Sequence, residues 1–286
     1  MHRASGAKRR LAGGHALIDT HCHLHHAQFQ ADREAVKAAA FAAGVTALLE
    51  VNIDAAGFRN AEDLANSDAR IFLTVGIHPH DTERATDQEL AELARHLDHP
   101  RVCAVGETGL DYFRDYAPRD RQRDFFRRHV ALARESGLPL VVHAREKPQG
   151  PSAHADIFEI LEEEGRGQVR GVLHCFSGDL ETARRAAGIG FKLGLGGAIT
   201  YAPPQSGSLI QAIARSIGAD VFLLETDCPY LSPVPKRGRR NEPSHLPWIL
   251  EAVARYLGRT TAEVEALTDA AARELFRLDV DATTSG

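Results

Sequence analysis

Short apolar runs alternate along the chain with longer amphipathic stretches. Counted generously, about eight such runs are present, over residues 16–19, 45–51, 71–77, 102–107, 139–143, 171–175, 191–196 and 221–227. This alternation is typical of a parallel sheet covered by helices. Eight is also the strand number of a closed (β/α)8 barrel, so the pattern favours a barrel over an open, doubly wound sheet.

The stretches between these runs have apolar residues at helical spacing. In residues 120–137, Phe126, Val130 and Ala133 recur at intervals of four and three residues, and Gly137 follows as a stop. Further helices are expected over residues 31–44, 86–97, 154–165, 244–258 and 260–278. Ser244 is a candidate N-cap for the first of the last two helices, and Thr260 or Thr261 for the second.

No linker or shift in composition divides the chain of 286 residues, so one α/β domain is expected. We expect the barrel over residues 15–280, with tails at 1–14 and 281–286. A Gly/Pro-rich loop at 201–208 and a Pro/basic loop at 228–243 follow the last two strands. In a barrel, both loops would lie on the face where active sites are built.

Charge and cysteine content narrow the class of protein. A formal net charge of −5 argues against a broad basic face that holds duplex DNA, although bound divalent cations would add positive charge. The four cysteines are well separated and form no C-x-x-C pair, which is typical of a reducing, cytoplasmic compartment. No secretory signal or membrane-spanning run is evident, so no role at a membrane is expected. No feature of the sequence indicates an obligate protein partner.

Six polar residues stand where apolar strands end, and in a barrel these ends meet at the C-terminal mouth. They are His21, His23, Glu107, His143, His174 and Asp227. His21 and His23 are two positions apart, so a strand presents both imidazoles on one side while Cys22 faces the other. A single histidine at a strand end is more often an ordinary hydrogen-bonding residue. Six such residues on five strands predict a metal centre.

Four imidazoles and two carboxylates exceed what one tetrahedral ion with an open position needs, so two divalent ions are expected. We assign His21, His23 and Asp227 to the first ion. His143 and His174 are assigned to the second ion, with Glu107 as the bridge. Two such ions stabilise the attacking and leaving oxygens of a phosphoryl displacement. Glu107 and Asp227 are both catalytic candidates, as the carboxylate that takes the proton of the attacking water.

With these residues in view, the chain resembles the TatD-related deoxyribonuclease family, within the amidohydrolase-like metal-dependent barrels. The matching strings, which run from Ile18 to Pro243, are IDTHCHL, GIHPH, GETGLDYFRD, VVHAREK, HCFSG, ETDCPYL and RRNEP. The resemblance implies divalent metals at the same six residues. It also implies a deoxyribonuclease acting on DNA, often as a 3′-to-5′ exonuclease, here expected on single strands. Family members use magnesium or another divalent ion, whereas imidazole suits manganese or zinc better, so Mg²⁺, Mn²⁺ and Zn²⁺ all stay open.

Other residues are candidates for contacting the substrate or orienting the ligands. His78, Arg145 and Lys192 are placed to contact the phosphate, and Asp111 follows Glu107 closely enough to orient a ligand from behind. The aromatic residues best placed for base stacking are Tyr112, Phe113, Phe176 and Tyr201.

Two other functions compete with the nuclease. The first is a hydrolase of C–N or C–O bonds, such as a deaminase, lactonase or amide hydrolase, because the fold alone does not select the substrate. The second is a non-catalytic protein in which the metal is structural. An open mixture of imidazoles and carboxylates at a barrel mouth argues against it.

Overall fold

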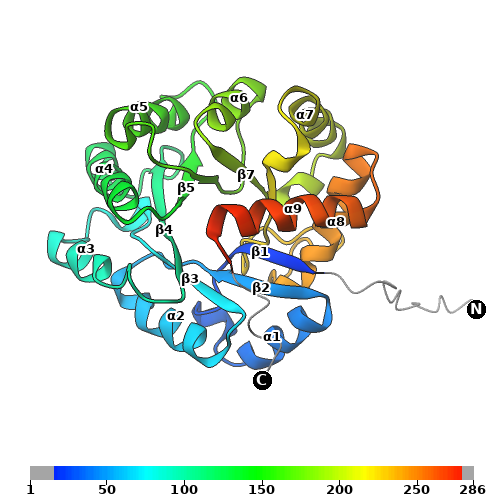
Figure 1. Ribbon diagram of the computed structural model, residues 1–286, viewed down its shortest axis with the longest axis horizontal. Coiled ribbons are helices and arrows are strands. Elements are labelled where there is room, and N and C mark those ends of the chain that lie inside the picture. The colour runs from blue at the N-terminus through cyan, green and yellow to red at the C-terminus, as the bar shows by residue number, and fades with distance from the viewer. Residues whose placement is uncertain (1–15, 279–286) are drawn as a thin grey trace, which may run out of the picture.

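The structure is a computed structural model and describes residues 16–278. Within this range, eight parallel strands pair in chain order (Figure 1). They are β1 (Leu17–Cys22), β2 (Val45–Glu50), β3 (Ile71–Val75), β4 (Val102–Asp111), β5 (Leu140–Arg145), β6 (Gly171–Leu173), β7 (Phe191–Leu195) and β8 (Phe222–Leu224). Each predicted apolar run overlaps one of these strands, although β1, β4 and β5 extend beyond the ends of their runs. The predicted tails, 1–14 and 281–286, lie outside the described residues.

The seam between β1 and β8 closes the sheet into a barrel. Cys22 and Cys228 form a parallel bridge. The buried Asp19 carboxylate accepts from the backbone N–H of Thr226 at 2.8 Å and from its hydroxyl at 2.6 Å. Side-chain and backbone hydrogen bonds across this seam replace the edges that an open sheet would leave unpaired. The predicted barrel is therefore confirmed.

Helices surround the barrel, and the last of them lies across one end (Figure 1). They are α1 (Arg33–Ala42), α2 (Ala55–Ser67), α3 (Asp87–Ala94), α4 (Arg119–Ser136), α5 (Ala153–Gly165), α6 (Leu180–Gly188), α7 (Pro203–Ser216), α8 (Leu246–Leu257) and α9 (Thr261–Phe276). No helix within residues 16–278 is long and apolar enough to cross a bilayer.

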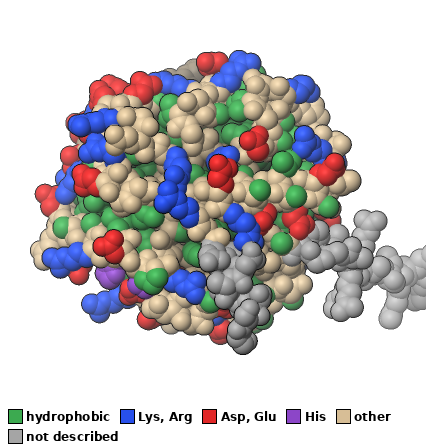
Figure 2. All heavy atoms as spheres, in the orientation of Figure 1, with side chains coloured by type: hydrophobic (Ala, Val, Ile, Leu, Met, Phe, Trp, Pro, Cys, Tyr) green, Lys and Arg blue, Asp and Glu red, His purple; other side chains and the backbone are tan. Residues whose placement is uncertain are grey.

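Helix α9 closes one end of the barrel. Its residues Ala272, Leu275 and Phe276 form a buried cluster with side chains of the barrel strands, including Ile18 and Val172. Because the amino ends of the strands are covered in this way, only the carboxyl ends are left to build an open site. Figure 2 shows acidic and basic side chains mixed over the face seen in Figure 1, with no broad basic area there.

The sequence located most element ends, but two expectations were wrong. Gly137, in a left-handed conformation, ends α4, and Thr260 caps α9 with Glu263 in a capping box. Ser244 is not an N-cap, because a 3-10 turn over Pro243–His245 precedes α8. The expected loop at 201–208 already contains the start of α7, since proline fits the first turn of a helix.

Candidate metal centre

A cavity of about 540 Å³ opens at the carboxyl ends of the strands. Its wall includes five of the six predicted ligands, namely His23, Glu107, His143, His174 and Asp227. The sixth, His21, lies fully buried beneath them. The sequence therefore located the mouth of the barrel and the residues that converge on it.

His21, His23 and Asp227 form one half of the cluster. The Nε2 atoms of His21 and His23 lie 3.2 Å apart. Asp227 Oδ1 lies 3.5 Å from His23 Nε2 and 3.8 Å from His21 Nε2. Cys22, between the two histidines, faces away and donates its thiol to the carbonyl of Leu49. This is the strand alternation that the sequence predicted.

His143 and His174 form the other half, and Glu107 lies between the halves. Glu107 Oε1 is 3.0 Å from His143 Nδ1 and 2.9 Å from His174 Nε2. Its other oxygen, Oε2, is 3.2 Å from His21 Nε2. The two oxygens of one carboxylate thus face the two groups of imidazoles, as a bridging ligand requires.

Glycines on both sides of Glu107 let β4 approach β5 closely. Gly106 and Gly109 have φ values of +139° and +136°, which side-chain-bearing residues rarely adopt. A Cβ atom at Gly106 would lie 2.4 Å from the carbonyl oxygen of Val141, and one at Gly109 would lie 2.1 Å from that of His143. The string GETG therefore provides both the predicted ligand and the backbone that brings it near His143.

Hydrogen bonds from the outer ring nitrogens fix which nitrogens face the cavity. His23 Nδ1 donates to the carbonyl of Val51 at 2.8 Å, and His143 Nε2 donates to Asp111 Oδ2 at 3.0 Å. With the proton on the outer nitrogen, the inner nitrogen keeps its lone pair for a cation. Glu225 Oε1 lies behind His174, 3.6 Å from its Nδ1.

The two carboxylates stay ionised although they are buried. Burial by itself raises the pKa of Glu107, but the surrounding imidazoles, led by His174, hold that pKa well below its usual value. Burial likewise raises the pKa of Asp227, and the hydrogen bond with His23 together with nearby imidazoles brings it below its usual value. Two buried negative charges among imidazole nitrogens form an environment that favours cations.

The donor set therefore fits divalent metal ions. Buried imidazoles present lone pairs toward one space, and His21 Nε2 lies within 3.2 Å of both His23 Nε2 and Glu107 Oε2. Nitrogen and carboxylate donors so close together are the ligands of zinc, manganese and related ions.

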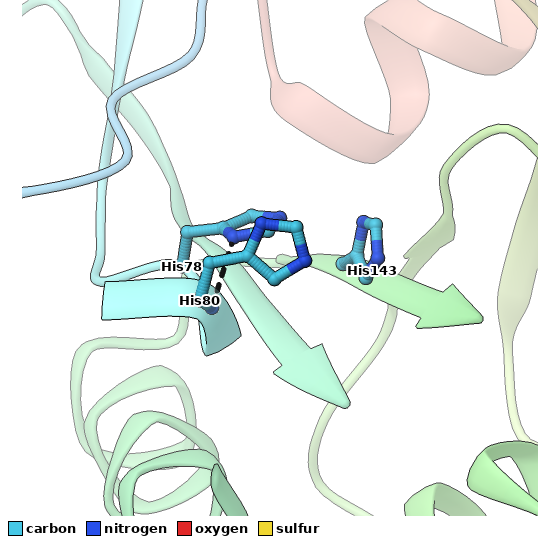
Figure 3. Close-up of side chains that lie close together, drawn as sticks. All are labelled: His78, His80 and His143. Carbon is cyan, nitrogen blue, oxygen red and sulfur yellow. Dashed lines mark hydrogen bonds between the residues drawn. The ribbon is translucent and has the colours of Figure 1, made fainter. Parts of the chain in front are cut away.

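His78 and His80 lie next to His143 of this cluster, as Figure 3 shows. His78 Nδ1 accepts the backbone N–H of His80 at 3.2 Å. Burial lowers the pKa of His78 to about 4, so its ring is neutral at pH 7 with the proton on Nε2. That N–H lies 3.4 Å from Glu107 Oε1. His80 Nε2 in turn donates to Asp111 at 2.7 Å. These protons make His78 and His80 donors rather than ligands of another ion.

Of the candidates for phosphate contact, two line the cavity and one does not. His78 and Arg145 belong to its wall. Lys192 lies near the other end of the barrel, where its Nζ donates to the carbonyl of Asp220 at 3.0 Å. Lys192 is the second residue of β7, near the amino end of that strand, so it does not reach the mouth.

Aromatic side chains at the cavity differ from the expected ones. Tyr112 is buried and donates its hydroxyl to Asp156, and Tyr201 donates to the carbonyl of Ser232. The cavity wall instead includes Tyr116 and Tyr230. Tyr230 lies within the string ETDCPYL and could have been noticed there, whereas nothing in the sequence pattern singled out Tyr116.

Residues 18–277 match the family model described as TatD related DNase. The chain belongs to the TatD-related DNase family. A relative named an uncharacterized metal-dependent hydrolase, YabD of Bacillus subtilis, is 36% identical over 263 residues, covering 92% of this chain and 100% of the relative. A protein of Escherichia coli K12 named 3′-5′ ssDNA/RNA exonuclease TatD is 34% identical over 267 residues, covering 91% of this chain and 98% of that protein.

Solved structures of TatD relatives have the same fold. YjjV, a TatD homologue from Escherichia coli, superimposes with a TM-score of 0.83 at 28% identity, covering 92% of this chain and 98% of that one. The phosphotriesterase homology protein of Escherichia coli, with phosphate in its active site, is more distant at a TM-score of 0.68 and 15% identity. At that identity the likeness concerns the barrel alone.

Proposed function

We propose that this chain is a metal-dependent deoxyribonuclease that hydrolyses phosphodiester bonds of single-stranded DNA from the 3′ end. The position of Glu107 is the main support, because its two oxygens face two separate groups of imidazoles. A relative covering nearly the same length is named a 3′-5′ ssDNA/RNA exonuclease, which favours a nucleic acid over other esters.

The six residues of the cluster would hold two divalent ions, Mg²⁺, Mn²⁺ or Zn²⁺. His21, His23 and Asp227 would hold one ion, and His143 and His174 the other. Glu107 would bridge the two. When bound, such ions lower the pKa of water and neutralise the charge that develops on phosphate oxygens. The imidazole-rich set favours manganese or zinc for affinity.

The chain's own side chains would divide the remaining work. Glu107 would use both oxygens as a bridge, so Asp227, with one oxygen left over as a ligand, would be the carboxylate that accepts the proton of the attacking water. Asp227 is 8% exposed and lies on the cavity wall, where water can reach it. His78 would donate its Nε2 proton in a hydrogen bond to the phosphate, and Arg145 would pair with a phosphate of the strand.

Hydrolysis of an oligonucleotide tests this function directly. Metal-stripped protein is given manganese, magnesium or zinc and mixed with a single-stranded oligonucleotide labelled at its 5′ end. We expect a ladder that shortens one nucleotide at a time, that depends on the metal and that disappears in the Glu107→Gln variant. The matched control is Glu146→Gln, a carboxylate just beyond β5 that accepts from Ser152 and His154 and does not line the cavity.

The result that would overturn the proposal is intact DNA with every metal, in protein that binds two ions. In that case amides, lactones and deamination substrates become the compounds to test on the same site. Cuts that begin inside the strand would instead contradict the proposed attack from the 3′ end, while the proposal of nuclease activity would be supported.

A further inference from the structure

The cavity above the metal centre has two walls of different chemistry. We call one the arginine wall. It consists of Arg114 and Tyr116 from the loop after β4, with Arg145 from the end of β5. We call the other the tyrosine wall, and it consists of His26, Tyr230 and Leu231 from the loops after β1 and β8.

The two arginines of the first wall are held by an aromatic ring and not by acids. The Arg145 guanidinium lies 4.3 Å from the centre of the Phe113 ring, and that of Arg114 lies 5.7 Å away. Within residues 16–278 neither guanidinium has a carboxylate partner. Asp115, the acid on the same loop, is engaged by Lys147 at 2.8 Å. Both arginines therefore keep their donors for phosphate.

Tyr116 presents an open aromatic surface beside these arginines. Its side chain is 60% exposed, and its ring meets His80 edge to face, with 4.8 Å between the ring centres. Asp111 orders the start of the loop, because its Oδ1 accepts the backbone N–H groups of Phe113 and Arg114. An exposed ring on an ordered loop is suited to stacking a nucleobase, whatever the base.

Tyr230 presents a similar surface on the opposite wall. It is 48% exposed and meets His23 and His26 edge to face, with ring centres 6.2 and 5.9 Å apart. Its backbone is fixed by the buried Asn241, whose amide donates to the carbonyl of Tyr230 at 2.7 Å. The tyrosine wall has neither arginine nor lysine among the residues that line the cavity.

We infer that the two walls bind different parts of a single strand, with the metal centre between them. The arginine wall binds the body of the strand, with its phosphates on Arg114 and Arg145. Tyr116 stacks one base that lies beyond the last two nucleotides. The tyrosine wall binds the terminal nucleotide that leaves, with its base on Tyr230. This assignment follows from charge. The body of the strand has several phosphates and fits the wall with two arginines, whereas the leaving nucleotide has only the scissile phosphate and fits the wall without arginine or lysine. This inference rests on the proposed function.

The test compares two substrates of different length. Values of kcat/KM are measured with the manganese-loaded protein on a ten-nucleotide thymidine strand and on the thymidine dinucleotide. The variants are Tyr116→Ala, Tyr230→Ala, and Tyr→Phe at both positions. Tyr116→Ala is expected to lower kcat/KM about tenfold on the long strand, mainly through KM, and by less than twofold on the dinucleotide. Tyr230→Ala is expected to lower it about tenfold on both, and the phenylalanine variants should keep their activity.

Binding without cleavage separates this inference from the proposed function. Oligonucleotides with 2-aminopurine at the last or at an internal position lose fluorescence when that base stacks on an aromatic ring. Quenching of the terminal probe should need Tyr230, and quenching of the internal probe should need Tyr116. If the wild-type protein quenches both probes but leaves DNA intact with every metal, the nuclease proposal is wrong, whereas the inference that the two walls bind bases is supported.

Other outcomes would overturn the inference itself. Equal losses for Tyr116→Ala on the long strand and the dinucleotide would mean that this side chain has no length-dependent role. Cleavage with no change in any of the four variants, or with neither probe quenched, would mean that the tyrosines do not stack on bases.

Discussion

At the scale of single residues, Asp111 connects the proposed metal centre to the loop above it. Its Oδ2 accepts from His80 at 2.7 Å and from His143 at 3.0 Å. Its Oδ1 accepts the backbone N–H groups of Phe113 and Arg114 at 2.9 and 2.8 Å. Burial raises the pKa of this carboxyl, but the hydrogen bonds from the two imidazoles outweigh burial and keep it ionised. One carboxylate thus orders a proposed ligand and the loop of the arginine wall together.

Replacing this carboxylate by an amide should weaken metal binding. In Asp111→Asn, the amide NH₂ would face the Nε2–H of His143, so the imidazole would move its proton to Nδ1 and lose the lone pair that faces Glu107. We expect the affinity for manganese, measured by titration calorimetry, to fall about 10- to 100-fold. Asp115→Asn, on the exposed part of the same loop, should bind manganese as the wild type does. Equal affinities in both variants would contradict this role for Asp111.

The sequence was informative about residues whose direction the backbone determines. His21, His23, Glu107, His143 and Asp227 could be placed because strand ends and alternation fix where such side chains point. Lys192 was placed wrongly because its position at the start of a strand was given too little weight. Tyr116 could not be found, since the conformation of an irregular loop decides its exposure.

At the scale of elements, a buried histidine joins α4 to the end of β3. His129 donates through Nδ1 to the carbonyl of Phe125 at 2.6 Å, so its Nε2 accepts the backbone N–H of Ile77 at 3.0 Å. Ile77 directly precedes His78, so this bond helps to hold the loop that delivers His78 to the cavity. Periodicity had predicted α4, but it could not show that a histidine inside it binds another element.

The protonation state of His129 should make the free energy of unfolding depend on pH. Burial lowers its pKa from 6.5 to about 4, so between these values the unfolded chain takes up a proton that the folded protein does not. Neutral His129 therefore makes its full contribution to the free energy of unfolding above pH 6.5. This contribution, about 3 kcal/mol, is lost as the pH falls toward 4. In urea unfolding of metal-free protein, H129Q should show a shallower loss of stability over this range than the wild type. If the free energy of unfolding falls equally steeply with pH in H129Q and in the wild type, His129 is not the source of this pH dependence.

At the scale of the whole molecule, the apolar cluster that stabilises the barrel and the side chains proposed to carry out chemistry lie at opposite ends of the strands. Helix α9 closes the amino ends of the strands with an apolar cluster, and the carboxyl ends are left to charged and aromatic side chains. The β/α alternation predicted this architecture, because each apolar run fits a buried parallel strand. The hydrogen bonds of Asp19 to Thr226 across the β1–β8 seam could not be predicted, since they join residues far apart in the sequence.

In this arrangement, bound metal ions would connect strands that lie on different sides of the barrel. The six proposed ligands lie on β1, β4, β5, β6 and β8 or within three residues of their ends, so ions that they share would connect strands on opposite sides of the seam. In the folded protein they are brought within a few ångströms, whereas in the unfolded chain they are far apart. Metal should therefore bind the folded state much more tightly, and its binding energy adds to the stability of the fold.

Removal of the metal should lower the melting temperature accordingly. An ion present at 100 times its Kd stabilises the folded state by about 2.7 kcal/mol, which for a domain of this size is a shift of roughly 5 to 10 °C. Scanning calorimetry with manganese and with a chelator measures this shift. Glu107→Gln should reduce it strongly because the bridge is lost, whereas Glu146→Gln should keep it. An unchanged melting temperature after chelation of manganese-loaded wild-type protein would mean that the cluster does not hold its ions in the folded state.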